Sequence, residues 1–106
     1  MVIQKIQIAG NLGNDAEVKE INSKKVLTLT VCCTKRFKRQ NGELVEVPCW
    51  YKVEQWRDAF NDNWISKLKK GACVYIDGEP NLETYLNRDN KAAGVIKINA
   101  DNIQIA

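Results

Sequence analysis

Apolar and polar residues alternate along two stretches in the first third of the chain. In "IQIAG", Ile6 and Ile8 have the same parity, and "VLTLTVCCT" repeats this pattern over a longer run. Because successive side chains of a strand point to opposite faces, a period of two predicts strands with one buried face. The longer run is expected to point these residues inward: Leu27, Leu29, Val31 and Cys33.

Glycine and asparagine residues separate the predicted strands. "GNLGND" at 10–15 predicts a bend, and "NSKK" at 22–25 predicts a turn. "QNGE" at 40–43 predicts a hairpin, since Asn-Gly accepts the positive φ angles of a tight turn. This hairpin joins the second strand to "LVEVPCWYKVEQW". The last strands are "ACVYIDG" and "GVIKINADNIQIA", with "NRDNK" at 87–91 as a loop or hairpin tip.

The strand after the hairpin carries an unusual set of residues on one of its two faces. Parity places Trp50, Lys52 and Trp56 on one face, together with Glu54, and leaves Val53 on the other. Tryptophan in a small barrel is more often a core residue than a ligand contact. Parity alone therefore leaves the role of the two tryptophans open.

Residues 57–70 have a different period. Phe60, Trp64 and Leu68 recur at helical spacing, and Gly71 follows where a helix C-cap is expected, so this segment predicts a helix with Trp64 facing the core. The result is an all-β chain of five strands with one α-helix between strands 3 and 4. This is the element order of the OB-fold, a small Greek-key barrel. The 106 residues are expected to form one such domain, residues 1–106.

Composition excludes several classes of protein. No run of about 18 apolar residues indicates a membrane span, and no secretory signal is evident, so a soluble cytoplasmic protein is expected. The four cysteines form no CxxC pair and the chain has no histidine, so neither a metal site nor a cofactor is predicted. Paired-carboxylate and phosphate-loop motifs are also missing, so we expect no enzyme and no small-molecule substrate.

Positive charge is concentrated in the middle of the chain. Residues 35–70 carry nine basic and five acidic groups, whereas the whole chain has a net charge of +3. Within "TKRFKR" at 34–39, four cations surround Phe37. A polyanionic partner and a solvated charged face are both compatible with this distribution.

Three stretches resemble bacterial single-stranded DNA-binding proteins: "GNLGNDAEVKEINSKKVLTLTV", "PCWYKVEQW" and "LKKGACVYIDGEP". The resemblance runs in order from about Lys5 to Ile105, with Ala16 where the family usually has proline and Tyr51 where it often has histidine. The family typically continues through a linker to an acidic tail that recruits repair and replication partners. The sequence ends at "NIQIA", so we expect this tail, and the recruitment that depends on it, to be missing.

The resemblance implies sequence-independent binding of single-stranded DNA, which the family protects during replication, recombination and repair. Bases stack on aromatic side chains while cations follow the phosphates. The family positions for base stacking fall on Phe37, Trp50, Trp56 and Tyr85. The cations expected at the phosphates are Lys35, Arg36, Lys38, Arg39 and Lys52.

The resemblance also implies assembly of several copies. Family members form homotetramers, usually from dimers that pair their barrels by the first strand. We therefore expect a homo-oligomer, with a tetramer as the first expectation and a dimer as the second. The resemblance also implies a nucleoid-associated location in the cytoplasm. The expected interface residues are Val2, Ile3, Lys5 and Tyr51. Two alternatives stay open. One is a primosome-type accessory protein that acts through protein contacts, and the other is an RNA-binding OB module.

Overall fold

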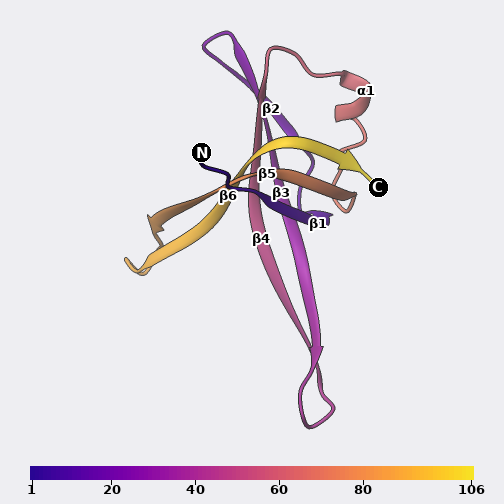
Figure 1. Cartoon of the computed structure of the whole chain (residues 1–106), viewed down its shortest axis with the longest axis vertical. Helices are drawn as coiled ribbons and strands as arrows, with labels where there is room; N and C mark the ends of the chain where they lie inside the picture. The colour runs from indigo at the N-terminus through magenta and orange to yellow at the C-terminus, as the bar shows by residue number, and fades with distance from the viewer.

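The computed structural model describes residues 1–106 and is almost entirely β-structure (Figure 1). Its elements, in chain order, are the strands β1 (Ile6–Leu12), β2 (Glu17–Ile21), β3 (Lys24–Lys38) and β4 (Leu44–Arg57), the helix α1 (Asp62–Ile65), and the strands β5 (Cys73–Leu86) and β6 (Ala92–Ile105). The predicted all-β class is confirmed. The structure contains no membrane-crossing helix, because α1 spans four residues.

Five of the six strands close into a barrel. The sheet order is β1-β5-β6-β4-β3-β2, and an additional pairing of β1 with β3 through Asn11 and Leu12 closes the ring. The β4–β6 pair is parallel, and all other pairs are antiparallel. The helix lies between β4 and β5, the third and fourth strands of the barrel. The predicted five-stranded OB-fold with one intervening helix is therefore confirmed.

The core lies inside this barrel and follows the alternation of the sequence. Leu27, Leu29 and Val31 on β3 are fully buried, as predicted, while Cys33 is only half-buried. Burial of each aliphatic side chain of this size contributes roughly 1.5–3 kcal/mol. The other buried aliphatic residues of the core cluster are Ile8, Leu12, Val53, Leu68, Val74, Ile76, Ile98 and Ile103.

β2 is an additional strand outside the barrel. It pairs only with β3, and all five of its residues are exposed. Asn22 and Ser23 adopt positive φ angles of 50° and 67°, which turn the chain directly back into β3. The turn was predicted but the strand was not, since a strand without a buried face has no period-two apolar pattern.

The helix predicted over 57–70 is wrong in its extent. Asn61 caps α1 by accepting hydrogen bonds from the backbone N–H groups of Asn63 and Trp64, and the helix ends at the C-cap Ser66. Beyond it, the backbone bonds to a distant loop, because Ala16 N–H donates to the Leu68 carbonyl at 2.9 Å. Leu68 is nevertheless fully buried.

Gly71 does not cap the helix. Its φ of 90° lies in the region that favours glycine, and its N–H donates to the Leu12 carbonyl at 2.8 Å. It therefore joins the segment before β5 to the end of β1. Trp64 and Phe60 are half-buried and pack against the core, so their helical spacing reflected burial and not a continuous helix.

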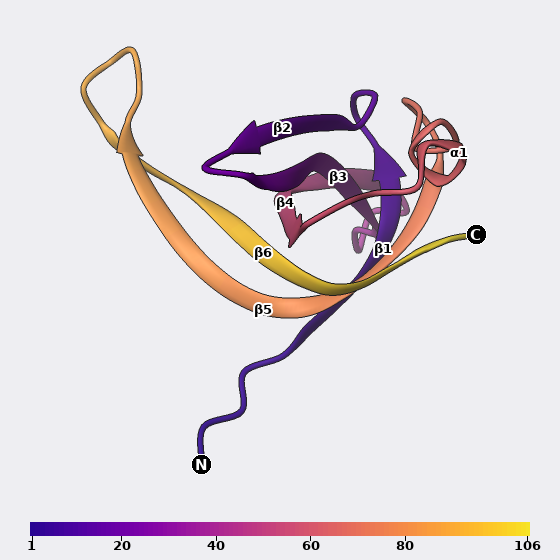
Figure 2. The same ribbon diagram turned by 90° about the horizontal axis from the view of Figure 1, so that it is seen from above.

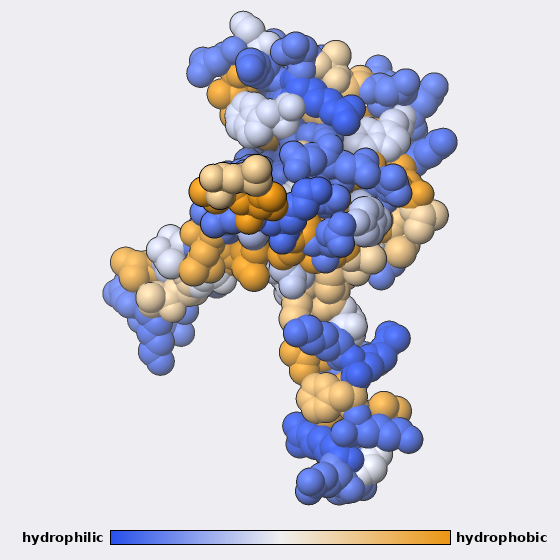
Figure 3. All heavy atoms as spheres, in the orientation of Figure 1, coloured by the Kyte–Doolittle hydropathy of each residue, from blue (hydrophilic) through white to orange (hydrophobic).

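Two hairpins extend beyond the barrel. We call residues 34–48 the β3–β4 arm and residues 82–96 the β5–β6 arm, and neither contains a buried residue. Figures 1 and 3 show the arms leaving the barrel in different directions. Gly42, with a φ of 83°, forms the predicted turn of the first arm, and "NRDNK" forms the tip of the second. A register shift between Asp77 and Gly78 accompanies the strong curvature of β5 and β6 in Figure 2.

Candidate nucleic-acid interface

The strand β4 presents a row of aromatic and charged side chains to solvent. Trp50 and Trp56 are 52% and 47% exposed, and the exposed Lys52 lies between them, whereas Val53 is fully buried. The alternation of β4 therefore places Trp50, Lys52 and Trp56 on the same side of the sheet, as their parity predicted. We call this side the outer face and the opposite side the inner face.

Strand register extends the outer face across β6 and β5. Lys52 lies beside Lys97 in the parallel pair, and Tyr85 lies opposite Ala93. The ion pair of Lys97 with Glu83 spans β6 and β5, which confirms that the odd-numbered residues of this part of β5 and β6 belong to the outer face. Tyr85 has the same parity as Glu83 and therefore lies on the outer face, out on the β5–β6 arm, where it is 54% exposed.

The structure does not place Phe37 on the outer face. Phe37 is opposite Val45, and Lys35 is opposite Val47, so both have the inner-face parity of Val31. Because they lie on the β3–β4 arm, beyond the barrel, both are exposed. The predicted stacking residues are thus divided. A DNA strand that contacts both Trp50 and Phe37 has to cross an edge of the β3–β4 ribbon.

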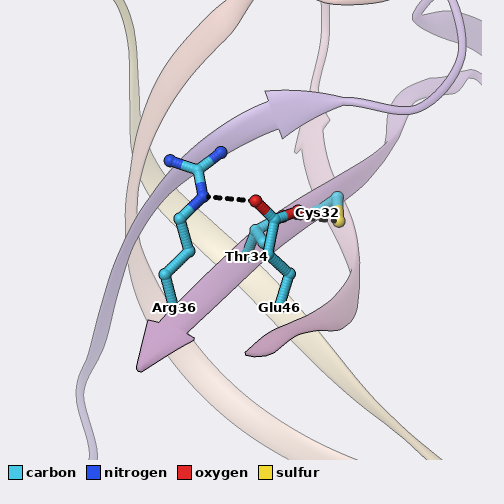
Figure 4. A network of polar contacts seen from close by, with 4 residues as sticks. All are labelled: Cys32, Thr34, Arg36 and Glu46. Atoms are coloured by element: carbon cyan, nitrogen blue, oxygen red, sulfur yellow. Dashed lines mark hydrogen bonds and ion pairs between the residues drawn. The ribbon is translucent and has the colours of Figure 1, made fainter. Parts of the chain in front are cut away.

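Three of the five predicted phosphate-binding cations already have a carboxylate partner. Arg36 Nε lies 3.0 Å from Glu46 Oε1, directly across the arm on the outer-face side (Figure 4). Arg39 pairs with Glu43 and Lys52 with Glu54, each at 3.9 Å. Both side chains of the Arg36 pair are more than half exposed, and such pairs contribute only about 0–1 kcal/mol. A phosphate is therefore able to replace the carboxylate.

Lys35 and Lys38 make no ion pair, and their side chains extend from opposite sides of the β3–β4 arm. Figure 4 shows Arg36 reaching Glu46, with Thr34 and Cys32 next along the same side of β3. Lys38 continues this alternating series and has the outer-face parity. The arm accordingly offers cations on both of its faces.

Lys97 is a cation of this face that the sequence interpretation missed. Its ammonium lies 3.0 Å from Glu54 Oε2 and 3.4 Å from Glu83 Oε1. The hydrogen bond to Glu54 is the main cause that raises the pKa of Lys97 above its ordinary value of 10.5. Its sequence signal was a lone lysine between Ile96 and Ile98, which indicates an outward position on the last strand.

The residues predicted at the oligomer interface occupy two places. Val2 and Ile3 precede β1 and are exposed, and the N-terminal segment that carries them extends away from the barrel in Figure 2. Lys5 pairs with Asp77 at 3.9 Å. Tyr51 is half-buried on the inner face of β4, beside the partly exposed Ile96. No hydrogen bond or ion pair links Tyr51 to Val2 or Ile3.

The four cysteines are free thiols, and nowhere do three or more Cys, Asp or Glu side chains gather in a metal-binding arrangement. Cys33 and Cys49 are directly opposite in β3 and β4, and Cys33 Sγ lies 3.3 Å from the Ala9 carbonyl oxygen. Burial is the main cause that raises the pKa of the Cys33 thiol, and the neighbouring cysteines contribute. A raised pKa disfavours the thiolate, the form that binds metals and attacks electrophiles.

Comparison with known proteins gives consistent matches. The model of the single-strand binding protein family matches residues 3–106. The chain is 31% identical to single-stranded DNA-binding protein 2 of Chlorobaculum tepidum, covering 96% of this chain and 70% of that protein. It is 23% identical to the mitochondrial single-stranded DNA-binding protein of Oryctolagus cuniculus, and the match covers 95% of this chain and 73% of that protein.

A solved structure has a similar fold. The crystal structure of a small single-stranded DNA-binding protein from Streptomyces coelicolor superposes with a TM-score of 0.77 at 16% identity, covering 100% of this chain and 96% of that chain. At this identity the match supports the fold. The match of the family model and the 31% identical relative establish more than the fold, and together they show that this chain belongs to the single-strand binding protein family.

Proposed function

We propose that this protein binds single-stranded DNA without sequence preference and protects it during replication, recombination and repair. The observation that carries the proposal is the row of Trp50, Lys52 and Trp56 on the outer face of β4. Both indoles are about half exposed, whereas Val53 on the opposite face of the same strand is fully buried in the core. Exposed aromatic side chains interleaved with cations are the arrangement that single-strand binding requires.

Binding combines two kinds of contact. Bases stack on Trp50, Trp56 and Tyr85 on the outer face, and on Phe37 where the strand has crossed to the inner side of the β3–β4 arm. Phosphates approach Arg36, Lys38 and Lys52 on the outer-face side, and Lys35 and Arg39 on the arm. Stacking is tolerant of sequence because every base has an aromatic face, so these contacts position the strand without reading it.

We propose that the protein acts by binding alone, as a single OB-fold domain, and without catalysis or a cofactor. On the outer face of the barrel, the carboxylates Glu54 and Glu83 are held in ion pairs with Lys52 and Lys97, which supports a role in binding. Binding to chromosomal DNA would give it a nucleoid-associated location.

We also propose that the protein works as a homo-oligomer, with a homotetramer as the expected form and Val2, Ile3, Lys5 and Tyr51 at its interfaces. One edge of β1 supports this proposal. Residues Ile6–Asn11 pair with β5 along one edge, but the other edge meets β3 only at Asn11 and Leu12. Residues Ile6–Gly10 make no strand pairing on that edge, which leaves it open to β1 of a second copy.

Tryptophan fluorescence tests the proposed binding face. Oligo-dT is expected to quench the emission of the protein strongly, because a base stacked on Trp50 or Trp56 perturbs the indole directly. Trp64 packs against the core, so it should supply the emission that remains at saturation. Duplex DNA of the same length is the control and should quench much less. Unchanged emission with oligo-dT that is bound in a gel-shift assay would refute the stacking face.

Two further measurements complete this test. Competition between oligo-dT and oligo-U separates DNA binding from RNA binding, and preferential binding of oligo-U would contradict the proposal. Light scattering coupled to size-exclusion chromatography measures the number of copies in the assembly. A monomer at concentrations that saturate DNA binding would contradict the proposed oligomer but not the binding face.

A further inference from the structure

Gly13, in the loop between β1 and β2, lies against the indole of Trp50. A Cβ atom added to Gly13 would stand 2.6 Å from Cζ3 and 3.1 Å from Cη2 of that ring. Carbon atoms of protein side chains pack at about 3.5–4.0 Å, so only the hydrogen of glycine fits in this space. Gly13 and Trp50 are therefore in direct contact although they are far apart in the sequence.

Hydrogen bonds hold the backbone of the Gly13 loop on both sides. The Gly13 N–H donates to the Thr30 carbonyl at 2.8 Å, which fixes the loop to β3. The segment that precedes β5 holds the loop from the other direction. Its bonds to residues 12–16 are Leu12 N–H to Ala72 O, Gly71 N–H to Leu12 O, Ala16 N–H to Leu68 O, and Lys70 N–H to Asp15 Oδ1, all at 2.8–2.9 Å.

Thr30 connects this loop to the outer face. Thr30 lies opposite Lys52 in the β3–β4 register, and Trp50 lies opposite Cys32, so Thr30 and Trp50 are diagonal neighbours on the same face. The added Cβ of Gly13 would also lie 3.8 Å from Thr30 Cγ2. The loop thus reaches across the outer face next to β3 and bounds the indole on one side, while about half of Trp50 stays open to solvent.

We propose that Gly13 is a positioning residue for DNA binding, and that the hydrogen-bonded loop around it is a fixed support for the Trp50 indole. The inference rests on the proposed function of Trp50 in base stacking. An indole that already lies in one orientation loses little rotamer freedom when a base stacks on it, so less of the stacking energy is lost to ordering the side chain. Glycine is required because any side chain would occupy the place of the ring.

Gly13→Ala isolates this role. The φ of Gly13 is outside the positive region, so alanine is compatible with the backbone there. The backbone is held by hydrogen bonds, whereas the far end of the indole is the movable group. We therefore expect the substitution to leave the barrel folded and to displace the Trp50 ring from its orientation.

The matched control is Gly94→Ala. It makes the same chemical change in a β-strand, and its Cβ would meet only Leu82 Cδ1 at 3.4 Å and the Glu83 carbonyl at 3.7 Å. Other glycines are unsuitable. A Cβ at Gly10 or Gly78 would collide with backbone atoms, and Gly42 and Gly71 have positive φ angles.

The experiment combines an NMR signal with a binding constant. The three tryptophans should give three indole N–H cross-peaks in a ¹H–¹⁵N spectrum. Gly13→Ala should shift the Trp50 peak and leave the Trp64 peak in place. In a fluorescence-anisotropy titration with labelled oligo-dT, Gly13→Ala should weaken binding, approaching the roughly 5- to 150-fold loss that removal of one stacking contact produces. Gly94→Ala should bind like the unsubstituted protein.

Trp50→Ala separates this inference from the function on which it rests. If Trp50→Ala weakens binding and Gly13→Ala adds nothing in that background, Gly13 acts through Trp50. The positioning role is overturned if Gly13→Ala binds normally while Trp50→Ala binds weakly, or if the two losses add. If Trp50→Ala itself binds normally, the stacking role of Trp50 is refuted, and the positioning role with it.

Discussion

Lys97 on β6 donates to Glu54 on β4 at 3.0 Å, across the parallel strand pair that contributes to closing the barrel. The same ammonium reaches Glu83 on β5 at 3.4 Å, so one cation connects three neighbouring strands. Lys97 and Glu54 are 20% and 13% exposed, which protects the pair from much of the screening that weakens surface ion pairs. Two consequences can be measured, one for stability and one for DNA binding.

Lys97→Met is expected to destabilise the fold, because it leaves Glu54 without its closest cation. The cost should lie between the roughly 1 kcal/mol of an exposed pair and the roughly 3 kcal/mol of a buried one. The raised pKa of Lys97 means that its stabilisation is fully present below the ordinary value of 10.5 and is lost as the pH rises through the folded-state pKa.

Urea denaturation of the unsubstituted protein and of Lys97→Met, from neutral pH to above pH 10.5, measures the stabilisation by Lys97. The difference in unfolding free energy should be constant from neutral pH to pH 9 and should shrink above pH 10.5. A difference that stays constant into strong alkali would show that Lys97 stabilises by packing of its aliphatic chain and not by its charge.

Glu54→Gln is expected to tighten the binding of single-stranded DNA. Glu54 holds both Lys97 and Lys52, and phosphates must compete with it for these cations. Removing the carboxylate should raise the affinity roughly 2- to 5-fold and make the slope of log K against log salt more negative by about 0.7 for each additional phosphate neutralised. Glu20→Gln is the control, since this exposed carboxylate on β2 makes no ion pair. Equal effects of both substitutions would indicate a general change of net charge.

Phe37→Ala is expected to have an effect that depends on the length of the DNA. Phe37 and Trp50 lie five register positions apart, about 17 Å along the strand, and on opposite faces of the β3–β4 ribbon. An oligo-dT of about 4 nucleotides should lose affinity with Trp50→Ala but not with Phe37→Ala, whereas one of about 16 nucleotides should lose affinity with both. Isothermal titration with the two lengths tests this. Equal losses at both lengths would mean that the path does not cross the ribbon edge.

Leu68→Ala is expected to cost about 2–5 kcal/mol of unfolding free energy, because Leu68 is fully buried in the core although it lies outside any helix or strand. Leu82→Ala makes the same chemical change at an exposed position of the β5–β6 arm, and it should stay within about 0.5 kcal/mol. Urea denaturation measures both. A small cost at Leu68 would place that side chain outside the core.

The barrel was predictable wherever one face of a strand is buried. Leu27, Leu29 and Val31 gave a clear period of two, and the same parity rule placed Trp50 and Trp56 on a shared face. The false prediction of a long helix has a physical cause. An irregular segment that packs against the core can also place an apolar residue at every third or fourth position. The spacing of Phe60, Trp64 and Leu68 therefore indicated that these residues pack in or against the core, but not that they lie on one helix.

The candidate site was less predictable because it depends on contacts between distant strands. Lys97 reaches Glu54 only through the parallel pairing of β4 and β6, and Gly13 meets Trp50 only because two separate loops are joined by hydrogen bonds. Phe37 is a different case. Its parity matches Leu29 and Val31, so the sequence itself already indicated that it does not share a face with the outward residues of β3.

The pairing of Ile6 with Gly78, and of Gly78 with Ala100, also governs how the chain can fold. Such distant pairs form only after the entropy of closing long loops has been overcome, so barrels of this kind fold in milliseconds to seconds. The β3–β4 hairpin forms from neighbouring residues and needs no such delay. During synthesis on the ribosome, β1 cannot pair with β5 until β5 has left the exit tunnel, so Ile6 and Ile8 lack their final partners throughout this interval.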